Sequence, residues 1–118
     1  MKNNIGKQGE NIASTYLINK GYHIVKQNYR YNRCEIDVIA KKEGFIIAIE
    51  VKTRSQNQIM KPWEAVNKLK QKKIIKVMDS FINKSELDLE VRFDIISIIK
   101  SGNRHQIEHI INAFYPTL

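Results

Sequence analysis

Two strand-length segments, residues 35–41 and 45–52, are separated by a short turn that contains Gly44, and this pattern constrains the fold more than any other. Both segments are rich in β-branched residues, and a two-residue turn between them is typical of a hairpin. Such a turn pairs Lys42 with Phe45 and thereby sets the register of the whole hairpin. A four-residue loop gives the same register, whereas a three-residue loop would shift it by one residue and reverse the faces.

In this register, Asp37 faces Glu50. Side chains alternate between the two faces of a strand, so Glu50 and Lys52 share a face and lie about 7 Å apart along the strand. Opposed carboxylates on a partly buried face repel each other. A hard divalent cation offsets this repulsion, which makes Asp37 and Glu50 candidate ligands for Mg²⁺, with Mn²⁺ as a substitute.

A metal at this position would give Lys52 a role in holding or activating a water, as in metal-assisted phosphoryl chemistry. A second interpretation needs no metal. Glu35 and Asp37 could both pair with Lys52 and form a ladder of salt bridges on a solvated face. The spacing alone leaves both interpretations open.

The other segments predict a single α/β domain over residues 1–118, because a chain of 118 residues has room for one core. Helix, three strands, helix and strand follow one another, which favours a mixed sheet flanked by helices. The expected elements are a helix over residues 5–20 that ends at Gly21, a strand over 22–31, an exposed mobile loop over 53–61, a basic helix over 62–84 with Pro62 at its start, a buried strand over 90–100, and a tail over 105–114 that could be helix or strand. The basic helix is either continuous or broken near its start.

The charge balance points to nucleic acid. Twenty Lys and Arg against twelve Asp and Glu leave a formal charge of +8 and a pI near 9.6. The lysines of the basic helix could be only its solvated face, as most runs of charge are. Their nearly unmixed positive sign favours contact with phosphate instead. The candidate phosphate-binding residues are Arg54, Lys68, Lys72, Lys73 and Lys76.

The apolar runs are too short for a membrane span, so we expect no membrane association. The polar first residues predict no leader peptide. The lone Cys34 cannot form an internal disulfide and is expected to be an inert thiol. We therefore expect a cytoplasmic protein.

The spacing of Asp37, Glu50 and Lys52 resembles the PD-(D/E)xK nuclease motif, with Ile36 in the place of the proline. A longer pattern is more specific. It reads, in order, G-K-Q-G-E-N-I-A-S-T-Y-L-I-N-K-G-Y, Q-N-Y-R, E-I-D-V-I-A, I-E-V-K-T-R, R-F-D-I-I and I-N-A-F. Over residues 6–114 this is similar to the YraN family of restriction-endonuclease-like proteins.

The resemblance implies an αβββαβ core and kinship with archaeal four-way-junction resolvases. It also implies that Asp37 and Glu50 are metal ligands, that Lys52 is catalytic, and that Glu10 is a further acidic member of the site. A carboxylate near a helix start is also favoured by the helix dipole, so Glu10 could instead be a solvated surface residue.

The expected function is that of a Mg²⁺-dependent endonuclease that hydrolyses phosphodiester bonds of DNA, including branched or repair intermediates. The alternative is a nucleic-acid-binding protein with the same fold and little or no turnover. A third, weaker hypothesis is an adaptor that binds a protein through the basic helix. A junction resolvase would need two sites, which leaves a homodimer open.

Three further sets of residues have a structural interpretation beside a functional one. His105 and His109 would share a helical face, but packing or surface roles are commoner than zinc ligation. Trp63 and Tyr31 could stack on bases, although buried aromatics are commoner. We expect Arg92 and Asp94 to be structural.

Overall fold

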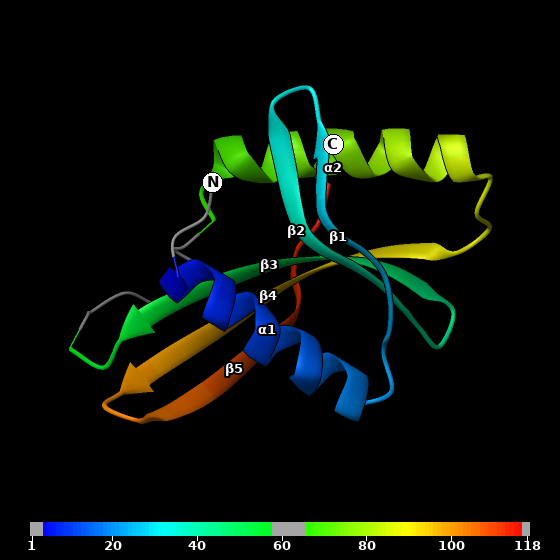
Figure 1. Ribbon diagram of the computed structural model, residues 1–118. Coiled ribbons are helices and arrows are strands. Elements are labelled where there is room, and N and C mark those ends of the chain that lie inside the picture. Colours follow the sequence, from blue (N-terminus) through cyan, green and yellow to red (C-terminus); the bar gives the residue numbers. More distant parts are fainter. Residues whose placement is uncertain (1–3, 58–65, 117–118) are drawn as a thin grey trace.

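A mixed β-sheet forms the centre of the molecule and carries a helix on each face (Figure 1). The computed structural model describes residues 4–57 and 66–116. Within them the strand order is β1-β2-β3-β4-β5, and only β3 and β4 run parallel. The elements are α1 (Asn4–Asn19), β1 (His23–Tyr31), β2 (Cys34–Lys42), β3 (Phe45–Ser55), α2 (Lys68–Ser85), β4 (Glu90–Ser101) and β5 (Arg104–Phe114).

This order confirms the predicted α/β class and αβββαβ core, and it is consistent with a restriction-endonuclease-like fold. The tail, for which helix and strand were both open, is the edge strand β5. Within the described ranges no helix combines the length and apolarity needed to cross a bilayer.

The β2–β3 hairpin has the predicted register. Glu43 and Gly44 have φ angles of 49° and 86°, the left-handed pair that a two-residue type I′ turn requires. Lys42 therefore pairs with Phe45, and the backbone pairing continues as far as Val38 opposite Ile49. It ends one step before Asp37 and Glu50, so the two strands part where these carboxylates stand.

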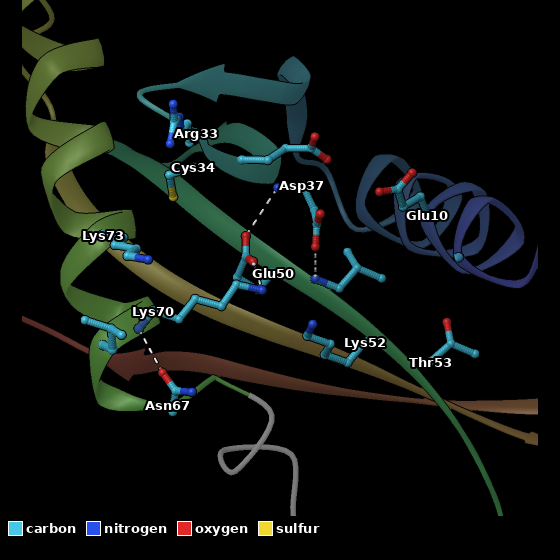
Figure 2. A pocket seen from close by; sticks show the side chains of 14 residues that line it. Glu10, Arg33, Cys34, Asp37, Glu50, Lys52, Thr53, Asn67, Lys70 and Lys73 are labelled. Carbon is cyan, nitrogen blue, oxygen red and sulfur yellow. Dashed lines mark hydrogen bonds and ion pairs between the residues drawn. The ribbon is translucent and has the colours of Figure 1, made fainter. Parts of the chain in front are cut away.

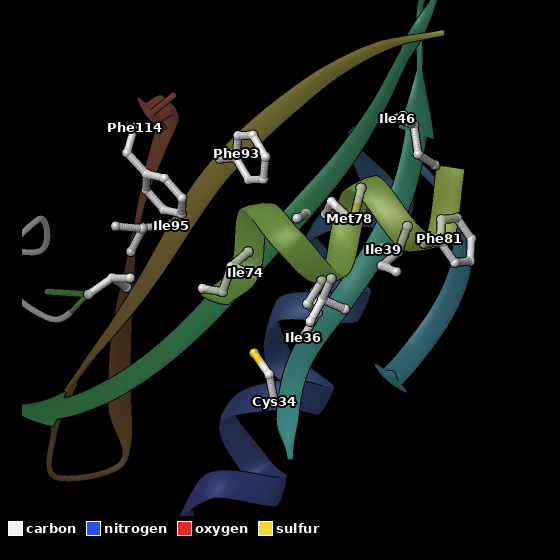
Figure 3. Close-up of a cluster of buried hydrophobic side chains, with 13 residues drawn as sticks. Cys34, Ile36, Ile39, Ile46, Ile74, Met78, Phe81, Phe93, Ile95 and Phe114 are labelled. Carbon is white, nitrogen blue, oxygen red and sulfur yellow. The ribbon is translucent and has the colours of Figure 1, made fainter. Parts of the chain in front are cut away.

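Successive residues of β3 serve two different apolar layers. Ile46 and Ala48 pack toward α2, whereas Ile47 and Ile49 pack toward α1. Figure 3 shows the α2 layer, to which the helix contributes Ile74, Val77, Met78 and Phe81. In the other layer, α1 contributes Ala13 and Leu17. The central strand is consequently buried on both faces.

β2 changes face along its length. Val38 and Ala40 belong to the α1 layer, but Ile36 belongs to the α2 layer, although residues two apart share a face in a flat strand. The β1–β2 hairpin therefore coils over α2 (Figure 1). The Tyr29 ring meets the Phe81 ring edge-on, with 5.2 Å between the ring centres. This turn in β2 decides where the side chains of Glu35 and Asp37 point.

One predicted boundary was wrong, and a second is tested only in part. α2 begins at Lys68, because the Asn67 side chain accepts a hydrogen bond from the Lys70 amide at 2.9 Å and caps the helix. The predicted start at Pro62 lies outside the described residues. β3 continues to Ser55, which pairs with Lys100, so residues 53–55 are strand and not loop.

α1 ends at Asn19, two residues before the predicted stop at Gly21. The Tyr22 amide donates to the Leu17 carbonyl at 2.9 Å, the Gly21 amide donates to the Ile18 carbonyl at 3.0 Å, and Gly21 adopts a left-handed φ of 90°. These contacts form the glycine-terminated C-cap that satisfies the last carbonyl groups of a helix.

Candidate metal and nucleic-acid site

A pocket of about 680 Å³ opens where β2 and β3 part, between the start of α1 and the start of α2. The four residues predicted to be catalytic, Glu10, Asp37, Glu50 and Lys52, all line it (Figure 2). They come from α1, β2 and β3, so the fold brings together groups that are up to 42 positions apart in the chain (52 − 10).

Asp37 and Glu50 are linked through each other's strands. The Asp37 amide donates to Glu50 Oε2 at 3.2 Å, and the Val51 amide donates to Asp37 Oδ2 at 2.8 Å. These two bonds stand where the backbone pairing of the hairpin has ended. The carboxylates thus satisfy backbone groups that the parting of the strands would otherwise leave unpaired.

Three carboxylates gather on the α1 side of the pocket. Each of Glu10, Glu35 and Asp37 offers an oxygen within 4.8 Å of the other two, and all three residues are partly buried. Figure 2 shows Asp37 between Glu50 on one side and Glu10 on the other. The geometry therefore adds Glu35 to the predicted acidic residues, and Asp37 joins this trio to Glu50.

Gly9 sets the distance between α1 and β3. It is buried, and a Cβ atom placed on it would overlap Thr53 Oγ1 and would lie 3.6 Å from Ile98 Cδ1. Only glycine permits this close approach without a shift of the neighbouring atoms. Since Glu10 is the next residue, the packing at Gly9 brings the Glu10 carboxylate to the pocket.

Glu50 is the most buried charged group of the pocket, with 1% of its side chain exposed. Burial raises its pKa to about 7, and the negative charge of Asp37 acts in the same direction. Lys70 opposes this effect, because its Nζ lies 3.1 Å from Glu50 Oε1. Glu50 is therefore poised between its charged and neutral forms near neutral pH.

Two lysines face this carboxylate and also influence each other. Burial lowers the pKa of Lys52, and the neighbouring Lys70 lowers it further. Burial also works against the charge on Lys70, but Glu50 outweighs it and the pKa of Lys70 is raised. Lys70 is thus held in its charged form, and Lys52 is the lysine that can more easily give up a proton.

Of the residues predicted to contact phosphate, Lys73 lines the pocket. Lys68, Lys72 and Lys76 are exposed along α2, and Arg54 is partly buried on β3. None of these four lines the pocket. Their role in binding stays a prediction.

Lys70 was not among the predicted site residues, although the sequence contains a signal for it. It lies four residues before Ile74, seven before Val77 and eight before Met78, which places it on the buried stripe of α2. A lysine at such a position must direct its ammonium group to a partner near the core. The other lysines of this helix are exposed.

Asp94, Arg92 and His109 form a separate polar network outside the pocket. Arg92 donates to both oxygens of Asp94 at 2.9 Å, and His109 Nε2 lies 2.7 Å from Asp94 Oδ2. His109 Nδ1 lies 3.0 Å from the Tyr16 hydroxyl. Arg92 and Asp94 therefore pair with each other, as one of the sequence interpretations had it, and neither lines the pocket.

The remaining candidates are placed as follows. His105 is exposed on β5, whereas His109 is packed against Asp94. Tyr31 is half-buried beneath Lys84, whose Nζ lies 4.3 Å from the ring centre. Trp63 lies outside the described residues. The Cys34 thiol is buried, and its burial raises its pKa, in agreement with an inert thiol.

Comparison with known proteins places these residues in a family. A model of the "Uncharacterised protein family UPF0102" matches residues 9–98. A UPF0102 protein of Christiangramia forsetii is 44% identical over 113 residues, which cover 96% of this chain and 95% of that protein. A UPF0102 protein of Bacteroides thetaiotaomicron is 41% identical over 116 residues, with coverage of 98% and 96%. The chain therefore belongs to the UPF0102 family, the YraN family that the sequence pattern resembles.

Proposed function

We propose that this protein is a Mg²⁺-dependent endonuclease that hydrolyses phosphodiester bonds of DNA. The observation that carries the proposal is the composition of one pocket, in which three clustered carboxylates, the buried Glu50 and three lysines stand together. Carboxylates suit a divalent ion and lysines suit a phosphate, so a metal-bridged phosphate is the ligand that fits both halves.

The donor atoms fit a hard cation. Glu10, Glu35 and Asp37 offer oxygen ligands only, within the 4.8 Å separation that a shared ion requires. Glu50 Oε1 is also buried without a well-formed hydrogen bond in the described part of the chain, although Lys70 Nζ lies 3.1 Å away. When bound, Mg²⁺ or Mn²⁺ would polarise a phosphoryl oxygen and lower the pKa of a water.

Different residues of the pocket would bind the ion and act on the substrate. Glu10, Glu35 and Asp37 would hold the ion, with Glu50 beside them. Lys52, whose pKa is lowered by burial and by Lys70, would exchange a proton with the attacking water or steady the charge that develops on the phosphate.

Lys73 lies at the pocket and would bind a neighbouring phosphate. The exposed lysines of α2 would extend this contact along the nucleic-acid backbone.

One observation favours a second function. The ion pair between Lys70 and Glu50 already neutralises the buried carboxylate without a metal. A nucleic-acid-binding protein with little or no turnover would be stable in this state. In that case DNA would bind through the lysines, and the acidic cluster would not be needed for chemistry.

Isothermal titration of Mg²⁺ and Mn²⁺, combined with cleavage assays on branched and linear DNA, would test the proposal. Asp37→Asn should abolish both metal binding and cleavage, because it removes the carboxylate that joins the acidic trio to Glu50. Asp79→Asn is the matched control, since Asp79 is exposed on α2 and does not line the pocket.

Metal binding without cleavage of any DNA would favour the binding protein. Absence of metal binding even with DNA present would rule out the proposed site. DNA binding that does not respond to salt would favour the protein-binding adaptor, because phosphate contacts weaken steeply as salt rises.

A further inference from the structure

Lys70 is the cation that the fold places against Glu50. It extends from the first turn of α2, where its own amide is fixed by the Asn67 cap at 2.9 Å, and its Nζ reaches Glu50 Oε1 at 3.1 Å (Figure 2). Glu50 belongs to the central strand and has 1% of its side chain exposed. The contact therefore joins the start of a helix to the middle of the sheet.

A carboxylate as deeply buried as Glu50 is costly unless a partner offsets its charge. One of its oxygens accepts the Asp37 amide at 3.2 Å, and the other has Lys70 as its ion-pair partner. Asp37 is itself a carboxylate, so it adds to the negative charge. In the described structure Lys70 is thus the group that makes an ionised Glu50 tolerable.

A divalent cation that also contacts Glu50 Oε1 would compete with Lys70 for this oxygen. A metal bound to Glu50 Oε1 would stand within a few ångströms of the Lys70 ammonium, and like charges at that distance repel strongly in a partly buried pocket. Lys52 adds to this repulsion, because it lies close enough to Lys70 for each to shift the other's pKa.

The ammonium group of Lys70 can leave the pocket. Its side chain is 35% exposed and has four rotatable bonds, so the ammonium can turn toward solvent while the helix stays in place. Glu50, on the central strand, has no such freedom.

We propose that Lys70 is the built-in counter-cation of Glu50 and that a divalent metal reaches Glu50 only by displacing it. The inference rests on the proposed metal site, to which it adds a residue and an order of events. Lys70 stabilises the metal-free protein. The free energy needed to move the Lys70 ammonium group away from Glu50 limits the affinity for the metal.

The first test is titration of Mn²⁺ alone into the wild type, Lys70→Met and Lys73→Met. Lys73 is the matched control, since it lines the same pocket but is exposed and has no ion pair with Glu50. Lys70→Met should bind Mn²⁺ roughly tenfold more tightly than the wild type, and Lys73→Met should change the affinity by less than about threefold. Equal effects of the two substitutions, or weaker binding by Lys70→Met, would overturn the competition.

The second test needs no metal. In the presence of EDTA, Lys70→Met should lower the melting temperature, because Glu50 loses its counter-cation, whereas Lys70→Arg should retain most of the stability. In the Glu50→Gln background the same Lys70→Met substitution should have little effect. Additive losses in this cycle would overturn the role of Lys70.

The two tests separate the inference from the proposed function. If no variant binds Mn²⁺ but the cycle shows coupling, the metal site and the displacement are wrong and the counter-cation stands. If Mn²⁺ binds equally to the wild type and Lys70→Met, the metal site stands and the displacement is wrong.

Discussion

The carboxylate of Asp37 accepts a hydrogen bond from the Val51 amide at 2.8 Å, across the point where β2 and β3 separate. Asp37 therefore has a structural task besides any role toward a metal. The same is true of Glu50, which accepts the Asp37 amide at 3.2 Å. Substitutions at this site must be chosen so that these bonds survive the loss of charge.

The variants Asp37→Asn and Asp37→Ala should differ in their free energy of unfolding. Asn can still accept from the Val51 amide, whereas Ala leaves this amide without its acceptor, at a cost of about 1–3 kcal/mol. Urea denaturation in EDTA should therefore show Asp37→Ala less stable than Asp37→Asn by that amount, while both lose metal binding. Equal stability of the two variants would show that the bond contributes nothing.

Glu50 should make the stability of the metal-free protein depend on pH. Its pKa is raised from 4.5 to about 7, so the folded state binds the proton more tightly than the unfolded state does. The stabilisation is complete below pH 4.5 and is lost as the pH rises to about 7, with an upper limit of about 3 kcal/mol. Denaturation curves at several pH values should show the wild type losing stability relative to Glu50→Gln across this range.

The comparison with Glu50→Gln is needed because Asp94 acts in the opposite sense. Burial works against its charge, but bonds from His109 and Arg92 outweigh burial and lower its pKa. The stability that Asp94 contributes is lost as the pH falls through its folded pKa, and this loss is common to both proteins. A difference between the two proteins that stays constant from pH 4.5 to 7 would contradict the role of Glu50.

Gly9→Ala should loosen the packing of α1 on β3. The added methyl group overlaps Thr53 Oγ1, and overpacking of this kind costs about 1–3 kcal/mol, which exceeds the gain of up to about 1 kcal/mol from helix propensity. Thermal unfolding should show the loss, and metal titration should show weaker binding because Glu10 moves with the helix. Thr53→Ala in the same chain should restore part of both, since it removes the overlapping atom. If Thr53→Ala restores neither the stability nor the metal affinity, the overlap with Thr53 is not the cause of the losses.

Asp94→Ala should be strongly destabilising and should leave the pocket intact. The side chain is fully buried and accepts bonds from Arg92, His109 and the Asn112 amide. Its removal leaves Arg92 without its partner, which typically costs about 3–5 kcal/mol. Thermal unfolding measures this loss, and Arg92→Met should recover part of it in the double variant. The Mn²⁺ affinity of the folded protein should be unchanged, and a large loss of affinity would connect the network to the site.

The exposed lysines of α2 should govern the salt dependence of DNA binding. Replacing Lys68, Lys72 and Lys76 with Gln should reduce the slope of log affinity against log salt by about 0.9 for each phosphate that the variant no longer neutralises. Fluorescence anisotropy at several salt concentrations gives this slope. A control variant with the same charge change carries Gln at three exposed basic residues outside α2, Lys20, Lys26 and Arg104. An equal decrease in both variants would indicate that only net charge matters.

The register of the β2–β3 hairpin and the end of α1 could be predicted from short stretches of the sequence. Both depend on a few neighbouring residues, because a two-residue turn at Glu43 and Gly44 permits one pairing and Gly21 permits a left-handed C-cap. Local steric rules decide such features without knowledge of the rest of the chain. This register brings Asp37 next to Glu50, where the Asp37 amide donates to Glu50 Oε2.

The first residue of α2 and the last residue of β3 were predicted less well. The Asn67 cap competes with Pro62 as a start signal. Residues 53–55 are held in β3 by pairing with residues of β4 that lie 45 positions further along the chain (98 − 53). Pairing between distant segments leaves no mark in the local pattern. Only the folded chain could settle these boundaries.

The groups that each acidic residue faces depend on how distant elements pack together. β2 coils between Ile36 and Val38, and this coil carries Glu35 and Asp37 toward Glu10 on α1. The packing of α2 buries Glu50 and presents Lys70 to it. The direction, burial and pKa of a side chain depend on which distant elements pack over it. This packing is a property of the folded molecule and not of any short segment.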